Sequence, residues 1–318
     1  MPEIIMTFFF YGTNTYALRQ QLAQMMAAYQ AKAGSDFGLE RVDASGIKPR
    51  ELVATLQASP FLANSRLVIV EGLAGNKAVA DQLADMLLAV PSSTVAVFVE
   101  REVDQRTALV KALSKADKVV KFEPLTGSQL LSWAAAEAQR LGAKAERRVL
   151  QQLIDLTGDD QWRLAGELGK LANYDPTITA ETVQRLVAPS LDQSVFDLVE
   201  AMTAGRTDAA LTAYRNLLAA RESELYILTM VQWQLRNLLL AKSAPNLTQA
   251  ELAKAAGMSP YVAGKMQSAQ RRHGEATLRR AYVLAADCEL DIKSGRLKAE
   301  AAVEQLVYRV ATASRAGD

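Results

Sequence analysis

The feature that most constrains this chain is a regular alternation of short β-rich runs with segments of helical periodicity, which continues to about residue 124. The β-rich runs are nearly continuous in Val, Ile and Phe. Strands of this kind are typical of a parallel sheet that helices cover on both faces. The predicted strands are residues 4–11, 37–44, 66–72, 94–100 and 118–123, and the predicted helices are residues 16–32, 48–58, 78–90 and 105–115. We therefore expect an α/β domain over residues 1–124.

The rest of the chain shows apolar residues at helical spacing and no further β signal. Gly142 and Gly158 follow helical segments as C-capping glycines do, and Pro176 and Pro189 interrupt the pattern. We expect two all-α domains after the first: a small one over residues 125–190 and a larger one over residues 191–318.

The charge balance argues against binding nucleic acid by bulk electrostatics. The chain has 36 Lys and Arg against 35 Asp and Glu, a formal net charge of +1, so any DNA contact would have to be local. The pairs Arg271-Arg272 and Arg279-Arg280 could make one, although solvated surface charge is the simpler interpretation. The apolar residues 4–10 are too few for a membrane span or a signal segment, so we expect no membrane association.

Reactive residues are few and are not grouped. The single cysteine, Cys288, cannot form an internal disulfide and lies among helix formers, which favours a buried structural thiol. The single histidine, His273, follows two arginines and precedes Gly274, which favours a solvated helix-end histidine over a catalytic base. No Cys/His cluster has metal-ligand spacing. We expect no metal site and no cofactor, and a reducing, cytoplasmic location.

The first predicted strand runs through a Gly-containing turn into a helix, which is the position of a phosphate loop. Such a loop needs a second glycine, a lysine and a Ser/Thr to surround the phosphates and serve Mg²⁺. Here Gly12 is followed by Thr13, Asn14 and Thr15, with no lysine. We interpret these four residues as a degenerate phosphate loop.

Carboxylates at the ends of the predicted strands do not supply a Mg²⁺ site that would indicate ATP hydrolysis. Glu71 stands alone, and Glu100 with Glu102 lacks the paired Asp-Glu form that holds Mg²⁺ in ATPases. A strand-end or helix-entry carboxylate is the simpler interpretation of each.

The segment between the second helix and the third strand carries two large apolar residues, Phe61 and Leu62. Pro60 disfavours helical geometry in the residue ahead of it, so the helix should end by Ser59. Apolar residues in a short connection are either tucked against the core or displayed as an anchor for a partner. The residues alone favour the tucked arrangement and leave the other open.

Together these segments resemble the delta subunit of the bacterial DNA polymerase III clamp loader. The resemblance extends over nearly the whole chain, and its most specific segment is "AADCELDIKSGRLKAEAAVEQLV", residues 285–307. The other matching segments, in order, are "YGTNTYALRQQL", "SPFLANSRLVIVEG", "VDQRTALVKALSK", "LAGELGKLANY", "VFDLVEAMTAG", "QWQLRNLLLAK" and "ELAKAAGMSPYVAGKM".

The resemblance implies an AAA+-like first domain, a small helical second domain and a helical collar domain that joins subunits in a pentamer. The implied partners are the beta sliding clamp, the gamma/tau motor subunits, the delta-prime subunit, and primer-template DNA through the assembled complex. It implies a DNA replication role within the DNA polymerase III holoenzyme, a nucleotidyltransferase complex, without ATP hydrolysis by the chain itself. A phosphate loop without its lysine is then expected.

In the family, apolar residues at a helix tip enter a hydrophobic pocket of the clamp. The matching positions are Phe61 and Leu62, flanked by Pro60 and Arg66, and the resemblance therefore favours their display. Two departures stand out. The family often has an acidic residue soon after the first glycine, and two basic residues before the third strand, where this chain has Ser65-Arg66. The second departure is compatible with a register of the motif that is shifted by one residue.

Two other classes compete with a clamp-opening subunit. An ATP-hydrolysing clamp-loader subunit, of the motor or delta-prime type, would show a GK[ST] loop, zinc-ligand spacing or an arginine finger in a Ser-Arg-Cys segment, and all three are missing. A helical DNA-binding protein would show a strongly basic half, which the near-neutral charge does not support.

Overall fold

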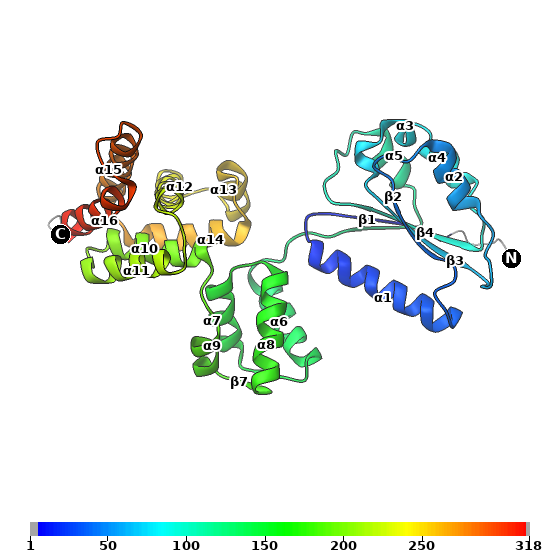
Figure 1. The fold of residues 1–318 in the computed structure, drawn as a ribbon, viewed down its shortest axis with the longest axis horizontal. Coiled ribbons are helices and arrows are strands. Elements are labelled where there is room, and N and C mark those ends of the chain that lie inside the picture. The colour runs from blue at the N-terminus through cyan, green and yellow to red at the C-terminus, as the bar shows by residue number, and fades with distance from the viewer. Residues whose placement is uncertain (1–5, 316–318) are drawn as a thin grey trace. The chain divides into compact units, whose positions relative to one another are not determined.

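The computed structural model describes residues 6–315 of the chain. The chain falls into two compact units, Met1–Leu125 and Thr126–Asp318 (Figure 1). The break between them falls at the end of the predicted α/β domain. The further division near residue 190 stays a prediction.

The first unit is built on a five-stranded parallel sheet in the order β2-β3-β4-β1-β5. In the register of the central pair, Phe9 lies opposite Phe98, and Phe10 of the same strand lies opposite Val120 of the edge strand. All five predicted strands are found, and the described part of the first begins at residue 6. The strands are β1 (Met6–Tyr11), β2 (Leu39–Asp43), β3 (Arg66–Glu71), β4 (Thr94–Glu100) and β5 (Lys118–Lys121).

Helices cover both faces of this sheet, as predicted. Helix α1 (Thr15–Ala33) lies alone on one face, and α2 (Pro49–Gln57), α3 (Lys77–Ala80), α4 (Leu83–Leu88) and α5 (Ala108–Leu113) lie on the other (Figure 1). Each strand contributes side chains to the apolar cores on both faces of the sheet, because successive side chains point to opposite faces. Phe10 packs with Leu18 and Leu22 of α1, whereas Phe9 and Phe98 join the core under the other helices.

Two local predictions needed correction. The helix expected over residues 78–90 is two short helices, α3 and α4, after a 3-10 turn at Leu73–Gly75. The second unit also contains a pair of two-residue parallel strands, β6 (Lys144–Ala145) and β7 (Thr177–Ile178). Strands this short leave no periodicity to detect, so the prediction of purely α structure missed them.

The second unit is otherwise helical. Its first part contains α6 (Gly127–Arg140), α7 (Arg147–Thr157), α8 (Gln161–Tyr174) and α9 (Ala180–Leu186). Its second part contains α10 (Leu191–Thr203), α11 (Thr207–Ala219), α12 (Glu224–Ser243), α13 (Gln249–Ala256), α14 (Pro260–Ala269), α15 (Glu275–Lys293) and α16 (Ala299–Arg315). A 3-10 turn at Gln270–Arg272 precedes α15.

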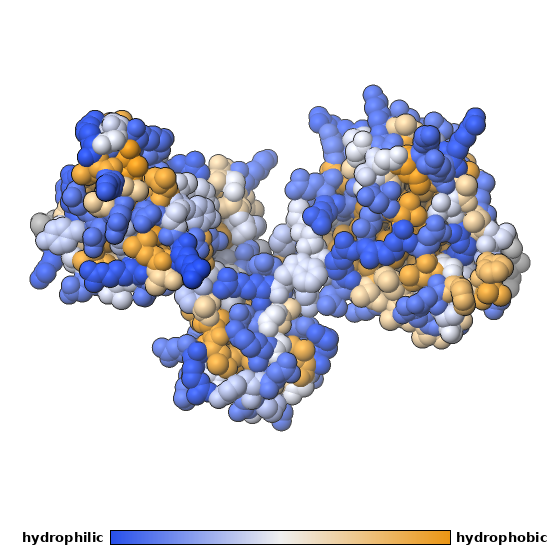
Figure 2. All heavy atoms as spheres, viewed as in Figure 1, coloured by the Kyte–Doolittle hydropathy of each residue, from blue (hydrophilic) through white to orange (hydrophobic). Residues whose placement is uncertain are grey.

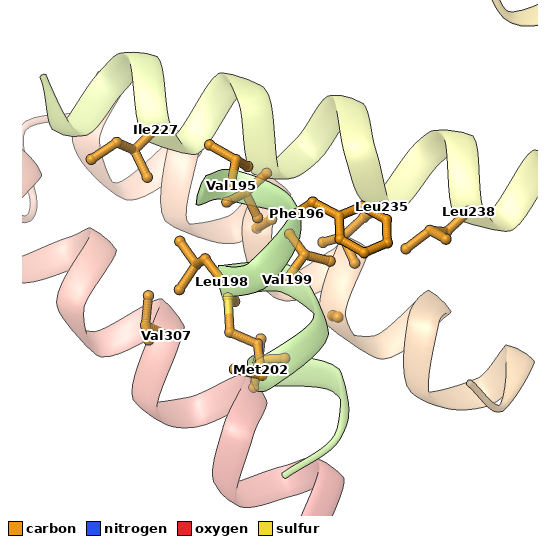
Figure 3. Close-up of a cluster of buried hydrophobic side chains, with 14 of the residues drawn as sticks. Val195, Phe196, Leu198, Val199, Met202, Ile227, Leu235, Leu238 and Val307 are labelled. Carbon is orange, nitrogen blue, oxygen red and sulfur yellow. The ribbon is translucent and has the colours of Figure 1, made fainter. Parts of the chain in front are cut away.

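Helices α10 to α16 share one large apolar core. Helix α10 lies between α12 and α16, with Val199 on the side of Leu235 of α12 and Leu198 on the side of Val307 of α16 (Figure 3). Every buried member of this cluster lies between residues 195 and 311. Cys288 is one of them, which confirms the predicted burial of this thiol, and burial raises its pKa to about 11.

The side chain of Asn237, on α12, is a polar exception in this core. It is 0% exposed, and neither its amide nitrogen nor its amide oxygen has a hydrogen-bond partner among the described residues. A buried polar group without a partner costs about 1–3 kcal/mol. Leucine has the same branching of heavy atoms and carries no such cost.

We expect Asn237→Leu to raise the free energy of unfolding of the second unit by about 1–2 kcal/mol. All three tryptophans, Trp133, Trp162 and Trp233, lie in this unit, so a urea titration followed by tryptophan fluorescence measures the effect. Asn216→Leu, at an exposed position of α11, is the matched control and should change stability by less than about 0.5 kcal/mol. A destabilised Asn237→Leu variant would show that a buried water satisfies the amide.

His273 was expected to be solvated, and this prediction was wrong. The imidazole is 6% exposed, and it lies where Gly274 caps the start of α15. Burial lowers its pKa, the Glu200 carboxylate opposes this, and the cations of Arg272, Lys242 and Arg206 act in the same direction as burial. The short polar sequence around His273 did not indicate burial, because residues distant in the sequence bury the ring.

The lowered pKa of His273 predicts a loss of stability in mild acid. The unfolded chain takes up a proton near pH 6.5 and the buried ring does not, so stability present above that pH is lost as pH falls below it. We expect a loss of up to about 1 kcal/mol between pH 7.5 and pH 5.5. Urea midpoints at the two pH values should show this difference in wild type and a smaller one in His273→Gln. An equal difference in both proteins would contradict the assignment.

Among the described residues, no helix is long and apolar enough to span a membrane.

Candidate functional site

The turn between β1 and α1 has the position of a phosphate loop, and the amides of Gly12, Asn14 and Thr15 already donate hydrogen bonds within the protein. The Gly12 amide donates to the carbonyl oxygens of Glu100 at 3.2 Å and Arg101 at 3.1 Å. The Asn14 amide donates to the carbonyl oxygen of Phe122 at 3.1 Å. In a working phosphate loop, amides of this kind point at the phosphates. In this chain the protein itself accepts these hydrogen bonds.

The conformation of this turn keeps it closed. Gly12 has φ +134°, and a Cβ atom at this position would lie 2.1 Å from the Phe122 carbonyl oxygen. The Asn14 side chain accepts from the Ala17 amide at 3.1 Å and caps α1, while its amide group donates to the Glu123 carbonyl oxygen at 2.9 Å. Asn14 is therefore a helix cap that ties the turn to the segment after β5. Thr13 and Thr15 lie within the same turn, where the Thr15 amide donates to the Thr13 carbonyl oxygen at 3.0 Å.

A hollow of about 630 Å³ lies beside this turn at the carboxyl ends of the strands. The Glu71 carboxylate, at the end of β3, accepts from Arg19 at 3.3 Å and from Arg41 at 2.9 Å. Glu100 is buried at the end of β4, where it accepts from the Ala74 amide at 3.1 Å and where burial raises its pKa. Glu71 is thus paired with two arginines, whereas an ATPase uses a strand-end carboxylate to hold Mg²⁺. No cluster of three or more metal-ligating side chains occurs among the described residues.

The apolar pair, Phe61 and Leu62, lies in the connection from α2 to β3. This connection is at the amino-terminal ends of the parallel strands, opposite to the hollow at their carboxyl ends. Phe61 is 75% exposed and Leu62 is 69% exposed, while Pro60 before them is partly buried. These are displayed side chains, which the residues alone did not favour. The space-filling view shows hydrophobic side chains at the surface of the first unit (Figure 2).

The backbone of this tip, defined as residues 59–64, is strained. Leu62 has φ +55°. A left-handed conformation costs a residue with a Cβ atom about 1–2 kcal/mol, and it persists only where the surroundings enforce it. Arg221 is the other non-glycine residue with positive φ among those described. Strain of this kind in an exposed apolar loop is typical of a binding surface.

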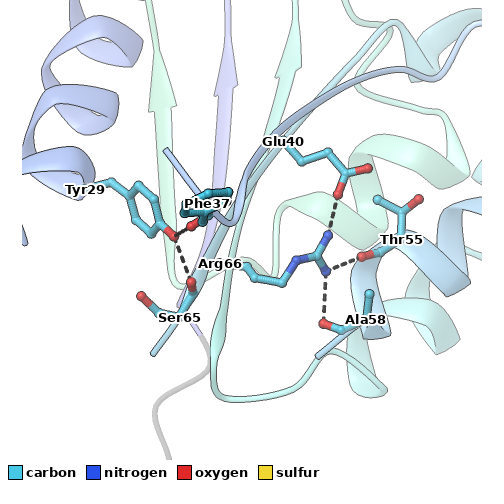
Figure 4. Close-up of polar contacts among 7 residues, drawn as sticks. All are labelled: Tyr29, Phe37, Glu40, Thr55, Ala58, Ser65 and Arg66. Atoms are coloured by element: carbon cyan, nitrogen blue, oxygen red, sulfur yellow. Dashed lines mark hydrogen bonds and ion pairs between the residues drawn. The ribbon is translucent and has the colours of Figure 1, made fainter. Parts of the chain in front are cut away.

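Arg66 takes a different place from the one predicted. It was expected to flank the apolar pair at the contact surface, but it is 6% exposed at the start of β3. Its guanidinium donates to the carbonyl oxygens of Thr55 at 2.6 Å and Ala58 at 3.0 Å, and it pairs with Glu40 of β2 (Figure 4). Arg66 therefore lies beneath the tip.

Comparison with known proteins decides the family. The family model described as "DNA polymerase III, delta subunit" matches residues 8–123, which include both the closed turn and the tip. The model described as "DNA polymerase III delta subunit, C-terminal domain" matches residues 192–310. The chain belongs to the DNA polymerase III delta subunit family.

The matches to relatives in the delta family cover almost the whole chain. DNA polymerase III subunit delta of Bacillus subtilis (strain 168) is 23% identical over 315 residues, which cover 92% of this chain and 89% of that protein. The solved structure of the Bacillus subtilis DNA clamp loader delta protein has a TM-score of 0.71 at 22% identity, covering 96% of this chain and 95% of that one. The predicted resemblance and fold class are confirmed.

Sequence reasoning missed two residues next to the tip of this delta-family chain, Tyr29 and Glu40. Tyr29 lies in α1 and its hydroxyl is 2.8 Å from the carbonyl oxygens of both Phe37 and Ser65 (Figure 4). Glu40 pairs with Arg66 from the neighbouring strand. Neither had a local signal for a contact with the base of the tip, because Ser65 is 36 residues from Tyr29 and Arg66 is 26 residues from Glu40.

Proposed function

We propose that this chain is the clamp-loader subunit that binds and opens the beta sliding clamp during DNA replication. Phe61 and Leu62, with Pro60 ahead of them, enter a hydrophobic pocket of the clamp. The delta family, shown by the matches to residues 8–123 and 192–310, supports the clamp-loader role.

The observation that carries the proposal is the exposure of two adjacent large apolar side chains on a strained loop. Water solvates such side chains poorly, and burying the pair in a pocket on a partner would recover a free energy of several kcal/mol. The first unit has a large core of its own on each face of the sheet. The tip is therefore not needed to complete the fold, and its display is best explained by a partner.

Opening the clamp follows from differential affinity. A protein that binds the opened ring more tightly than the closed ring shifts the equilibrium toward the opened ring by the ratio of the two affinities. No chemical step is required of the chain that binds. This agrees with the closed turn at Gly12 and with Glu71, whose carboxylate is held by two arginines.

The remaining partners belong to the same proposal. The gamma/tau motor subunits and the delta-prime subunit would join residues 191–318 in a collar, with residues 125–190 as a separate small domain. The motor subunits would hydrolyse ATP, and primer-template DNA would be contacted through the assembled complex. The proposed location is the cytoplasm.

The test is binding of the whole chain to the beta clamp of the same bacterium by surface plasmon resonance, with ring opening followed by a fluorophore pair placed across one interface of the clamp. We expect saturable binding and a separation of the fluorophores on binding. Absence of binding, or binding that leaves the interface closed, would contradict the proposal. Hydrolysis of Mg-ATP by the chain alone would instead favour an ATP-hydrolysing subunit.

A further inference from the structure

The tip is held at both of its ends by side chains that are not part of it. On the helix side, the Arg66 guanidinium donates to the carbonyl oxygens of Thr55 and Ala58, the last of which precedes the tip directly. On the strand side, the Tyr29 hydroxyl is 2.8 Å from the carbonyl oxygen of Ser65, which follows the tip directly. The six residues between these two points carry the strained Leu62.

The Arg66 contacts suit the end of a helix. The last carbonyl groups of α2 have no partner within the helix and carry its negative partial charge, which a cation there satisfies. Glu40 balances the charge of the guanidinium from β2, so a buried arginine is tolerated. All these contacts join α2 and β2 to the base of the tip, and none of them involves Phe61 or Leu62.

The Tyr29 contact also depends on its surroundings. A Cβ atom on Gly38 would lie 2.6 Å from the Tyr29 hydroxyl and 2.9 Å from the Ser65 carbonyl oxygen, and Gly38 has φ +92°. Glycine therefore lets the hydroxyl reach the base of the tip. The hydroxyl has one proton, which it shares between the carbonyl groups of Ser65 and Phe37.

We propose that Arg66 and Tyr29 are positioning residues that hold the tip in its binding conformation before the clamp arrives. This inference rests on the proposed function and concerns how the same surface is prepared. A loop that is already ordered loses less conformational entropy when it binds, and the affinity is higher by that amount. Neither residue contacts the clamp.

The experiment compares the wild-type chain with Tyr29→Phe, Arg66→Met and Arg66→Lys in clamp binding and in hydrogen exchange. Tyr29→Phe removes one hydroxyl, and Arg66→Met removes the guanidinium at similar length. We expect affinity for the clamp to fall about threefold in Tyr29→Phe and about tenfold in Arg66→Met, with partial recovery in Arg66→Lys, which keeps a cation at the helix end. Amides of residue 59 and residues 61–65 should exchange faster in the weakened variants than in wild type, while amides of β3 and β4 keep their protection.

Arg106→Met is the matched control, because Arg106 lies in the same unit and its side chain is 90% exposed. It should bind like wild type. The inference is overturned if Tyr29→Phe and Arg66→Met are folded and bind like wild type, or if the tip exchanges in these variants at the wild-type rate. A purely structural role would lower the melting temperature without changing the affinity measured well below it.

Failure of the proposed function gives a different result. In that case Phe61→Ala/Leu62→Ala binds the clamp like wild type, or wild type does not bind at all, and this inference falls with it. If the apolar pair matters but Tyr29 and Arg66 do not, only the positioning role fails.

Discussion

Phe61→Ala/Leu62→Ala is expected to weaken binding to the beta clamp at least about thirtyfold, which corresponds to a loss of about 2–4 kcal/mol. Two adjacent anchors that enter one pocket form a hot spot, and alanine removes most of the apolar surface that they bury. The measurement is the equilibrium dissociation constant by surface plasmon resonance. Circular dichroism should show that the fold is intact, because both side chains are exposed and contribute little to the core.

Leu88→Ala is the matched control for this prediction. Leu88 is 83% exposed at the end of α4, in the same unit as the tip. If apolar exposure alone caused the binding, Leu88→Ala would also weaken it. Equal affinity of wild type and the double variant would place the contact elsewhere and would show that the register carried over from the family is wrong.

Gly12→Ala is expected to destabilise the first unit by about 2–4 kcal/mol, the largest effect on stability that we predict. The added Cβ atom would lie 2.1 Å from the Phe122 carbonyl oxygen, and φ of +134° is a conformation that only glycine adopts readily. The turn would have to move away from β5 and lose hydrogen bonds that the Gly12 and Asn14 amides donate.

The probe for this variant has to report on the first unit. All three tryptophans lie beyond residue 125, so their fluorescence follows the second unit. Hydrogen exchange of the β1 and β4 amides across a urea series measures the unit of interest. Gly46→Ala is the control, since a Cβ atom there meets nothing within 4 Å, and its effect should stay within about 0.5 kcal/mol. Unchanged exchange in Gly12→Ala would mean that the turn is freer than its contacts indicate.

The sheet could be predicted from the sequence because its strands are continuous apolar runs. Residues 66–70 are all buried in the structure. A continuous apolar run predicts a strand that is covered on both faces, and this can be seen in the sequence without knowing which strands lie beside it. The helical spacing of apolar residues likewise predicted α1 and α2 close to their observed bounds. It failed for residues 78–90, where an apolar stretch is broken at Asp81 and Gln82 into two helices. Apolar spacing alone does not show such a break.

The candidate site could be predicted only in part. The loss of lysine after Gly12 was visible in the sequence, but the contact of the turn with Phe122 required the fold, because the two lie more than 100 residues apart. The display of Phe61 depended on family resemblance, since a loop residue can face either way. Arg66 was assigned to the contact surface by family resemblance alone, and the groups that accept its hydrogen bonds come from α2, the residue after it, and β2.

The closed turn at Gly12 also bears on what could control the binding and release of a partner. A nucleotide-driven switch alternates between two loop geometries as its ligand changes, whereas this turn has one set of hydrogen bonds that the protein satisfies by itself. Under the proposed function, this turn is therefore not the part of the chain that would time the release of a partner. Under the same proposal, capture and release would be timed by the neighbouring subunits, and the contribution of this turn to that cycle would be constant.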